Sequence, residues 1–273
     1  MAQARLLSRL VHDRTGAGEP VVLIHGIGHR RQTWDPVTDL LAQRYEVVRP
    51  DLAGFGESPA YPAGTPYNME NACADLAANF AEWGLERPHV VGNSLGGAIS
   101  LELAARGLVS SATVLSPAGF FGRFDRAWAL LTLSLLRLGA TLPDAVLRAN
   151  AHSALGRKVS GALLYSHPER ATAEGTYGDS LALKRASAFF PTIRAGLRYS
   201  CEPGDIEVPV TVAWGTGDRL LPYRQSREAR RRLPQAQHLA LPGCGHIPMI
   251  DDPELVVSTV EATISRATAS EAA

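Results

Sequence analysis

Short apolar runs recur along the first half of the chain, and each run ends in glycine or polar residues. Four of them, at 21–24, 45–48, 89–91 and 111–115, have the length and composition of strands that are covered on both faces. Longer segments with helical spacing of apolar residues separate these runs, and 71–83 is the plainest. Strands that alternate with helices in this way predict an α/β fold with a mostly parallel, doubly wound sheet.

The same alternation reaches both ends of the chain. Loose alternation from Leu6 to Val11 predicts an edge strand. After residue 200 the expected elements are a strand at 208–214, a helix at 223–232, a strand at 237–241 and a terminal helix at 253–267. The sheet is therefore expected to draw its strands from both halves of the chain.

From about 120 to 200 the alternation stops, and the sequence becomes apolar and helix-like. We interpret this segment as a helical insertion that forms a cap. It follows the carboxyl end of a strand, where the ligand sites of parallel sheets lie, so we expect it to exclude water from the site. The expected organisation is a core domain of residues 1–119 and 201–273 with a helical cap of residues 120–200.

Bulk composition excludes several classes of function. Lys and Arg number 27, Asp and Glu also number 27, and the net charge is +0, so no overall field favours nucleic acid or an anionic surface. The three cysteines (Cys73, Cys201 and Cys244) have neither disulfide nor zinc spacing. No apolar signal core or membrane-length apolar run is present, so we expect a cytoplasmic protein without stable membrane insertion. The pattern assigns no oligomeric state.

The stretch from His89 to Ala98 carries the strongest chemical signal. It has the pattern of a buried strand, a Gly-x-Ser-x-Gly turn and the start of a helix. Such a sharp turn forces Ser94 into strained backbone angles, and side chains at positions 92 and 96 would collide, so both positions are glycine. The helix N-terminus adds oriented N–H groups beside the hydroxyl. Ser94 is therefore the candidate nucleophile.

A serine hydroxyl needs a base within hydrogen-bonding reach, and the base needs an acceptor that holds its tautomer. Asp218 and His246 follow the expected strands at 208–214 and 237–241. Both are therefore expected on loops at the same edge of the sheet as Ser94. They also occur in the order Ser, Asp, His, which is one of the known orders of a catalytic triad.

Other residues compete less well for these roles. Asp51 ends a different strand, and Asp251 and Asp252 are expected to cap the last helix. Cys244 has no comparable turn around it, so it is a poor rival nucleophile. His29 has no motif context and is expected at the surface or in the cap.

A second glycine-rich strand end occurs at His25-Gly26-Ile27-Gly28. Glycine lets a main-chain N–H approach a ligand closely, as the stabilisation of an oxyanion requires. The glycines near position 55 do not form a dinucleotide-binding loop, since Pro59 stands where the third glycine belongs, and no phosphate-binding Gly-Lys-Ser/Thr motif occurs. We expect neither a cofactor nor a metal.

Together these motifs resemble the α/β-hydrolase fold family, and in particular its capped serine esterases and lipases. The resemblance covers nearly the whole chain. Five segments carry it in family order, at 25–28, 51–58, 92–97, 214–218 and 245–246. It implies an α/β-hydrolase fold with a helical cap over the site.

The resemblance also implies roles for single residues. Ser94 would be the nucleophile, His246 the base and then the acid, and Asp218 the orienting carboxylate. The oxyanion hole would be formed by the backbone N–H groups of Leu95 and Ile27. For the second donor the alternatives are Gly26 and Gly28, and the residues expected to support the site are His25, Gly26, Gly28 and Asn93.

The reaction expected from this resemblance is hydrolysis of a carboxylic ester or thioester of a small to medium apolar substrate, through an acyl-enzyme. Carbon–carbon bond hydrolases of the meta-cleavage-product type keep the serine and are an alternative. They commonly carry an aromatic residue after the catalytic histidine, where this chain has Ile247. Cofactor-free perhydrolysis is a lesser alternative, and a binding protein without catalysis is a third.

Overall fold

Seven strands form one sheet in the part of the chain that this computed structural model describes, which is residues 5–122, 124–202 and 204–271. Their spatial order is β1-β3-β2-β4-β5-β6-β7, and every neighbouring pair is parallel except β1 with β3. The strands are β1 (His12–Thr15), β2 (Glu19–Ile24), β3 (Tyr45–Pro50), β4 (His89–Asn93), β5 (Ser111–Leu115), β6 (Val210–Gly215) and β7 (Gln237–Leu241). The expected α/β fold with a mostly parallel sheet is confirmed.

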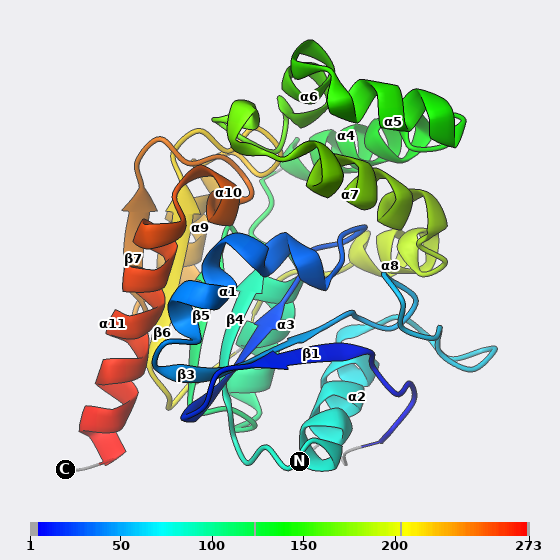
Figure 1. Ribbon diagram of the computed structural model, residues 1–273. Helices are drawn as coiled ribbons and strands as arrows, with labels where there is room; N and C mark the ends of the chain where they lie inside the picture. Colours follow the sequence, from blue (N-terminus) through cyan, green and yellow to red (C-terminus); the bar gives the residue numbers. More distant parts are fainter. Residues whose placement is uncertain (1–4, 123, 203, 272–273) are drawn as a thin grey trace.

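Helices cover both faces of the sheet (Figure 1). The helices outside the insertion are α1 (Asp35–Leu41), α2 (Met69–Glu82), α3 (Leu95–Ala105), α9 (Gln225–Arg232), α10 (Pro248–Asp251) and α11 (Pro253–Glu271), and a 3₁₀ turn (Arg31–Trp34) precedes α1. Val21 and Leu23 of β2 pack into one apolar layer with α1 and α11. Val22 and Ile24 pack into the other layer with α2, α3 and α9. Because successive side chains of a strand point to opposite faces, a continuous apolar run fills both layers.

The edge strand lies further along the chain than the alternation from Leu6 to Val11 predicted. It begins at His12 and pairs antiparallel with β3. The N–H groups of Leu7 and Ser8 instead donate to Asp75 Oδ1 on α2, at 2.8 and 2.9 Å. Backbone donors that are used by a helix side chain are not available to a neighbouring strand.

Other boundaries also differ from the expected ones. The helix expected at 71–83 is Met69–Glu82, and the helix expected at 223–232 begins at Gln225. The strand expected at 208–214 begins at Val210, because Pro209 has no N–H to contribute to the ladder. The terminal helix, expected to end at Ala267, continues to Glu271.

The segment between β5 and β6 is helical, as expected for the insertion. Its helices are α4 (Asp125–Gly139), α5 (Asp144–His152), α6 (Ala154–Gly161), a 3₁₀ turn (Pro168–Arg170), α7 (Ala173–Arg185) and α8 (Phe189–Gly196). In Figure 1, α4 to α7 lie above the sheet, on the side to which the arrow of β7 points. They therefore stand over the carboxyl ends of the parallel strands. Among the described residues no single helix is long and apolar enough to cross a membrane, whereas α4 and α5, bent by 107°, reach that length and composition as a pair.

Candidate active site

Ser94 lies at a tight turn between β4 and α3, where its backbone is in the left-handed region at φ 56°. Two glycines make this turn sterically possible. A Cβ at Gly92 would overlap the carbonyl oxygen of Gly96, and a Cβ at Gly96 would overlap the carbonyl oxygen of Ile24. Strain of this kind persists only where the surroundings enforce it, and here it presents a side chain that is 7% exposed at the end of the sheet.

Asp218 and His246 meet at the same edge. His246 Nδ1 lies 2.8 Å from Asp218 Oδ2, and both side chains are almost fully buried. The other carboxylate oxygen, Oδ1, accepts hydrogen bonds from the N–H groups of Leu220 and Leu221 at 2.9 and 2.8 Å. Both oxygens are therefore held, so the imidazole ring has a fixed orientation and its Nδ1 is occupied.

Asn93 joins the turn at Ser94 to its surroundings. Its side-chain amide donates to the carbonyl oxygen of Leu115 at 3.1 Å and to that of His246 at 2.9 Å. The backbone N–H of Ser94 also donates to Leu115 at 3.0 Å. A single buried amide thus links β4, β5 and the loop that carries His246.

The loop after β2 lies against the same serine. A Cβ at Gly26 would lie 3.2 Å from Ser94 Cβ, so this loop passes close to the hydroxyl-bearing residue. His25 Nε2 accepts a hydrogen bond from the N–H of Leu52 at 2.9 Å, and its Nδ1 therefore carries the proton and donates to the carbonyl oxygen of Gly26 at 2.7 Å. Burial lowers the pKa of His25, which favours this neutral form.

Gly28 and His29 complete the loop. Gly28 has φ 75°, and a Cβ there would meet Leu183 Cδ1 at 2.5 Å. His29, which was expected at the surface or in the cap, lies in the loop after β2 and lines the same cavity as Ser94. Burial lowers its pKa to about 4, and within the described residues its buried Nδ1 has no hydrogen-bond partner. Its position directly after the glycine loop was the only signal that could have identified it.

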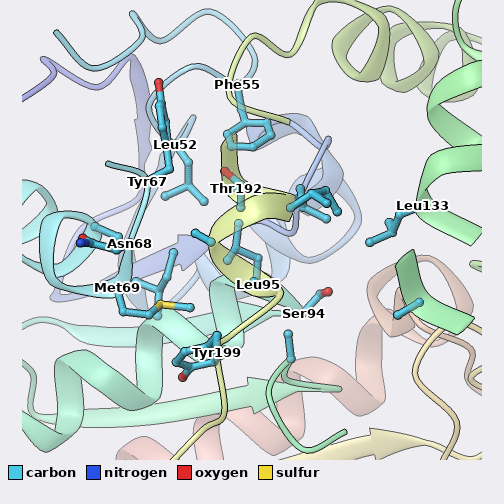
Figure 2. A pocket seen from close by; sticks show the side chains of 18 of the residues that line it. Leu52, Phe55, Tyr67, Asn68, Met69, Ser94, Leu95, Leu133, Thr192 and Tyr199 are labelled. Carbon is cyan, nitrogen blue, oxygen red and sulfur yellow. The ribbon is translucent and has the colours of Figure 1, made fainter. Parts of the chain in front are cut away.

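Two cavities meet at Ser94. The first has a volume of about 330 Å³ and a largely apolar lining, part of which Figure 2 shows. Its lining includes Leu52, Phe55, Met69, Leu95, Leu133, Thr192 and Tyr199. The second has a volume of about 410 Å³ and contains His246, with polar groups from Asn150, Arg157 and Asp179. Ile27, Ser94, Leu133 and Leu220 line both cavities.

The loop of His246 is attached to the helical insertion. The N–H groups of His246 and Ile247 both donate to the carbonyl oxygen of Leu164, at 2.8 and 3.1 Å. Leu164 lies between α6 and the following 3₁₀ turn. The position of the imidazole therefore depends on a segment of the insertion as well as on the sheet.

Asp251 has a different role from the helix cap that its position predicted. Its carboxylate, buried at 1% exposure, accepts hydrogen bonds from the backbone N–H groups of Gly245, Ser166 and His167 at 2.6, 3.1 and 2.7 Å. Only Asp252 caps α11, through the N–H of Leu255 at 3.0 Å. Asp251 thus joins the loop of His246 to the insertion.

Two other candidate residues are unsuited to the roles of orienting carboxylate and nucleophile. The Asp51 carboxylate accepts hydrogen bonds from the backbone and the guanidinium of Arg31, both at 2.6 Å. Burial raises the pKa of Cys244 to about 12, so its thiol stays protonated. Within the described ranges, no three His, Cys, Asp or Glu side chains are arranged to hold a metal ion.

Known proteins with similar sequences and structures cover most of the chain. An uncharacterised protein of Mycobacterium tuberculosis is 30% identical over 263 residues, which is 90% of this chain and 75% of that protein. Lipase 1 of Psychrobacter immobilis is 27% identical over 253 residues, which is 89% of this chain and 76% of the lipase. The crystal structure of the esterase RhEst1 from Rhodococcus sp. ECU1013 superposes with a TM-score of 0.73 at 28% identity, over 94% of this chain and 95% of that one.

A sequence model described as the alpha/beta hydrolase fold matches residues 19–253. This match includes six of the seven strands, from β2 to β7, and it includes every loop described above. The chain therefore belongs to the α/β-hydrolase fold family.

Proposed function

We propose that this protein hydrolyses carboxylic esters of apolar substrates, with Ser94 as nucleophile, His246 as general base and acid, and Asp218 as the carboxylate that orients His246. One observation carries the proposal. It is the 2.8 Å contact between Asp218 and His246 beside a cavity that Ser94 also lines. The esterase and lipase relatives support the same class of reaction.

In the acylation half-reaction, Ser94 Oγ attacks the carbonyl carbon of the ester while His246 Nε2 takes the hydroxyl proton. The tetrahedral intermediate then collapses, and His246 returns that proton to the leaving alkoxide, which departs as an alcohol. Asp218 stabilises the imidazolium that forms between these two steps. The product is an ester between Ser94 and the acyl group.

In the deacylation half-reaction, a water molecule gives one proton to His246 and attacks the acyl carbonyl carbon. Collapse of the second tetrahedral intermediate breaks the bond to Ser94 Oγ, which recovers the proton from His246. The acid is released and the enzyme returns to its initial state. Net consumption is one water per ester.

The negative charge of each intermediate needs fixed donors. The backbone N–H of Leu95 lies at the start of α3, and that of Ile27 lies in the loop whose neighbour Gly26 approaches Ser94. We assign these two groups as the oxyanion hole. Loss of one such donor raises the barrier by about 3 to 4 kcal/mol in comparable enzymes.

We propose that the two cavities hold the two parts of the substrate. His246 must reach the leaving oxygen to protonate it, and His246 lines only the second cavity. The alcohol part therefore belongs there. The acyl part then takes the first, largely apolar cavity of about 330 Å³ (Figure 2). An ester with an apolar acyl chain and a more polar alcohol fits this division.

The helical insertion supplies walls to both cavities. Leu133, Thr192 and Tyr199 line the first, and Leu164 and Leu183 line the second. We therefore propose that residues 120–200 act as a cap on a core of residues 1–119 and 201–273. Such a cap excludes bulk water from the reacting centre.

The test is hydrolysis of para-nitrophenyl esters of increasing acyl length by the purified protein and by Ser94→Ala. We expect the unaltered protein to show burst kinetics and to be labelled covalently at Ser94 by a fluorophosphonate. Turnover by Ser94→Ala should be lower by at least about 10³-fold. Equal turnover by the two proteins would overturn the assignment.

The same preparation distinguishes the other reactions that the family performs. A vinylogous dienol-diketone tests carbon–carbon bond hydrolysis, and peroxide with acetate tests perhydrolysis. Faster turnover of either than of every ester would replace ester hydrolysis as the function.

A further inference from the structure

Exposed apolar side chains are concentrated on the helical insertion. The described part of the chain has thirteen large apolar residues that are exposed, and eleven of them lie between residues 124 and 197. These eleven are Phe124, Trp128, Leu131, Leu135, Leu138, Leu142, Val146, Leu155, Val159, Phe190 and Leu197. Exposed apolar side chains gathered on one segment are typical of an interaction site, because large apolar patches on isolated proteins usually have a function.

Five of these residues form a stripe along α4. Phe124, Trp128, Leu131, Leu135 and Leu138 are spaced by four, three, four and three positions, so they share one helix face. Phe124 is 79% exposed and Leu138 is 66% exposed. The opposite face, which includes Ala129 and Thr132, is buried. Packing within the chain therefore leaves most of this apolar stripe on α4 exposed to solvent.

Part of this apolar surface borders the second cavity. Leu135, Leu142, Val146 and Val159 are exposed and also line the cavity that contains His246. Figure 1 places α4, α5 and α6 at the outer end of the molecule, furthest from the chain termini. An apolar molecule that entered here would cross apolar side chains on its way to Ser94.

The charge of the insertion differs from that of the rest of the chain. Residues 120–200 contain 11 Lys and Arg and 5 Asp and Glu, a net charge of +6, whereas the whole chain has +0 and the remainder therefore −6. On α6, Lys158 is exposed and shares a face with the exposed Leu155 and Val159. Basic and apolar groups on one face are typical of helices that lie at an anionic lipid surface.

We propose that the outer face of α4 to α6 binds the surface of a bilayer that contains anionic phospholipid, with the entrance of the second cavity against the lipid. The charge argues against a second copy of the chain as the occupant, since a symmetric dimer would bring two insertions of +6 together. Adsorption at a lipid surface is a separate property from ester hydrolysis, and it is measured without turnover.

The experiment is co-sedimentation of the full-length protein with unilamellar vesicles of phosphatidylcholine, with and without about one quarter phosphatidylglycerol. We expect about tenfold or more tighter binding to the anionic vesicles and loss of that difference in high salt. Equal binding to both vesicles, or no binding to either, would overturn the proposal.

Variants locate the surface. Leu131 and Leu138 are exposed and lie outside both cavities, so the double change Leu131→Ser and Leu138→Ser should weaken vesicle binding about tenfold or more. Lys158→Gln should weaken binding to anionic vesicles about fivefold and leave binding to neutral ones unchanged. Leu6→Ser, an exposed leucine remote from the insertion, is the matched control and should change nothing.

Each variant is also examined by sedimentation velocity and thermal unfolding. If the double variant abolishes a dimer and binds vesicles as the unaltered protein does, the apolar face is a self-association surface and the lipid proposal fails. If the double variant has the unfolding temperature and the vesicle binding of the unaltered protein, the lipid proposal is also excluded.

Discussion

Replacement of Asp251 by alanine should destabilise the protein and slow catalysis, although Asp251 lies in neither cavity. Its carboxylate accepts hydrogen bonds from three backbone N–H groups, those of Gly245, Ser166 and His167. Removing it leaves all three donors without this acceptor. The first precedes His246 directly, and the other two belong to the insertion.

The magnitude follows from the burial of these donors. A buried polar group that loses its partner costs about 1 to 3 kcal/mol. Gly245 is buried and bears the full cost, whereas Ser166 and His167 are partly exposed and gain water in exchange. The unfolding free energy of Asp251→Ala should therefore fall by about 2 to 4 kcal/mol, as measured by urea denaturation, most of it from Gly245. Asp251→Asn keeps one acceptor oxygen, so its unfolding free energy should lie between those of Asp251→Ala and the unaltered protein.

The effect on catalysis follows from the loop that Asp251 holds. His246 keeps its hydrogen bond to Asp218 but loses the anchor of the preceding residue. A displacement of about 1 Å costs on the order of 100-fold in rate, so kcat should fall about 10- to 100-fold at a temperature where the variant is folded. KM should change less than about threefold, because the cavity walls remain.

Asp252→Ala is the matched control. It removes one helix-capping hydrogen bond, to the N–H of Leu255, and should cost about 1 kcal/mol without changing kcat. If the two alanine variants had equal unfolding free energies, or if Asp251→Ala kept the kcat of the unaltered protein, the anchoring role of Asp251 would be refuted.

Three other predictions concern the cavities and their walls. The pKa of His29 is lowered from 6.5 to about 4, so as the pH falls from 6.5 to 4 the unfolded chain takes up a proton that the folded chain does not. The unfolding free energy of the unaltered protein, compared with that of His29→Gln, should therefore fall by up to about 3 kcal/mol in urea titrations across that range. A difference between the two proteins that stayed constant with pH would contradict this. Asn93→Ala removes donors to Leu115 and His246 and should lower the unfolding free energy by about 1 to 3 kcal/mol together with kcat, whereas a loss of stability alone would exclude a positioning role. Thr192→Trp fills the first cavity, so kcat/KM should fall at least about tenfold for octanoyl esters and little for acetyl esters; a parallel fall for both would show that the acyl chain lies elsewhere.

The sheet and the turn at Ser94 could be predicted because their signals are local. A buried strand produces a continuous apolar run, and the tight turn requires glycine at two fixed positions around Ser94. The parallel arrangement then brings the loops of Asp218 and His246 to one edge without any knowledge of side-chain contacts. The 2.8 Å hydrogen bond between the two side chains is a contact that this topology permits and that only the structure shows.

Two of the errors arose where backbone groups bind side chains that are distant in the sequence. Asp75 takes the N–H groups of Leu7 and Ser8, which are 68 and 67 positions away, and so displaces the edge strand. Asp251 takes N–H groups 84 and 85 positions away. Because every residue except proline has an N–H, such partners carry no mark in the sequence, and only the packed structure reveals them.

The total charge of the chain does not show how charge is divided along it. A sum of zero over the chain is compatible with a uniform surface, but here it hides +6 on residues 120–200 against −6 on the remainder. The division matters because the same segment carries the exposed apolar stripe and holds the loop of His246 through Leu164. A lipid surface that bound the insertion would therefore also affect the loop that carries His246. Because Leu164, Ser166 and His167 are all hydrogen-bonded to that loop or to Asp251, residues 164–167 are the part of the insertion through which such an effect would reach His246.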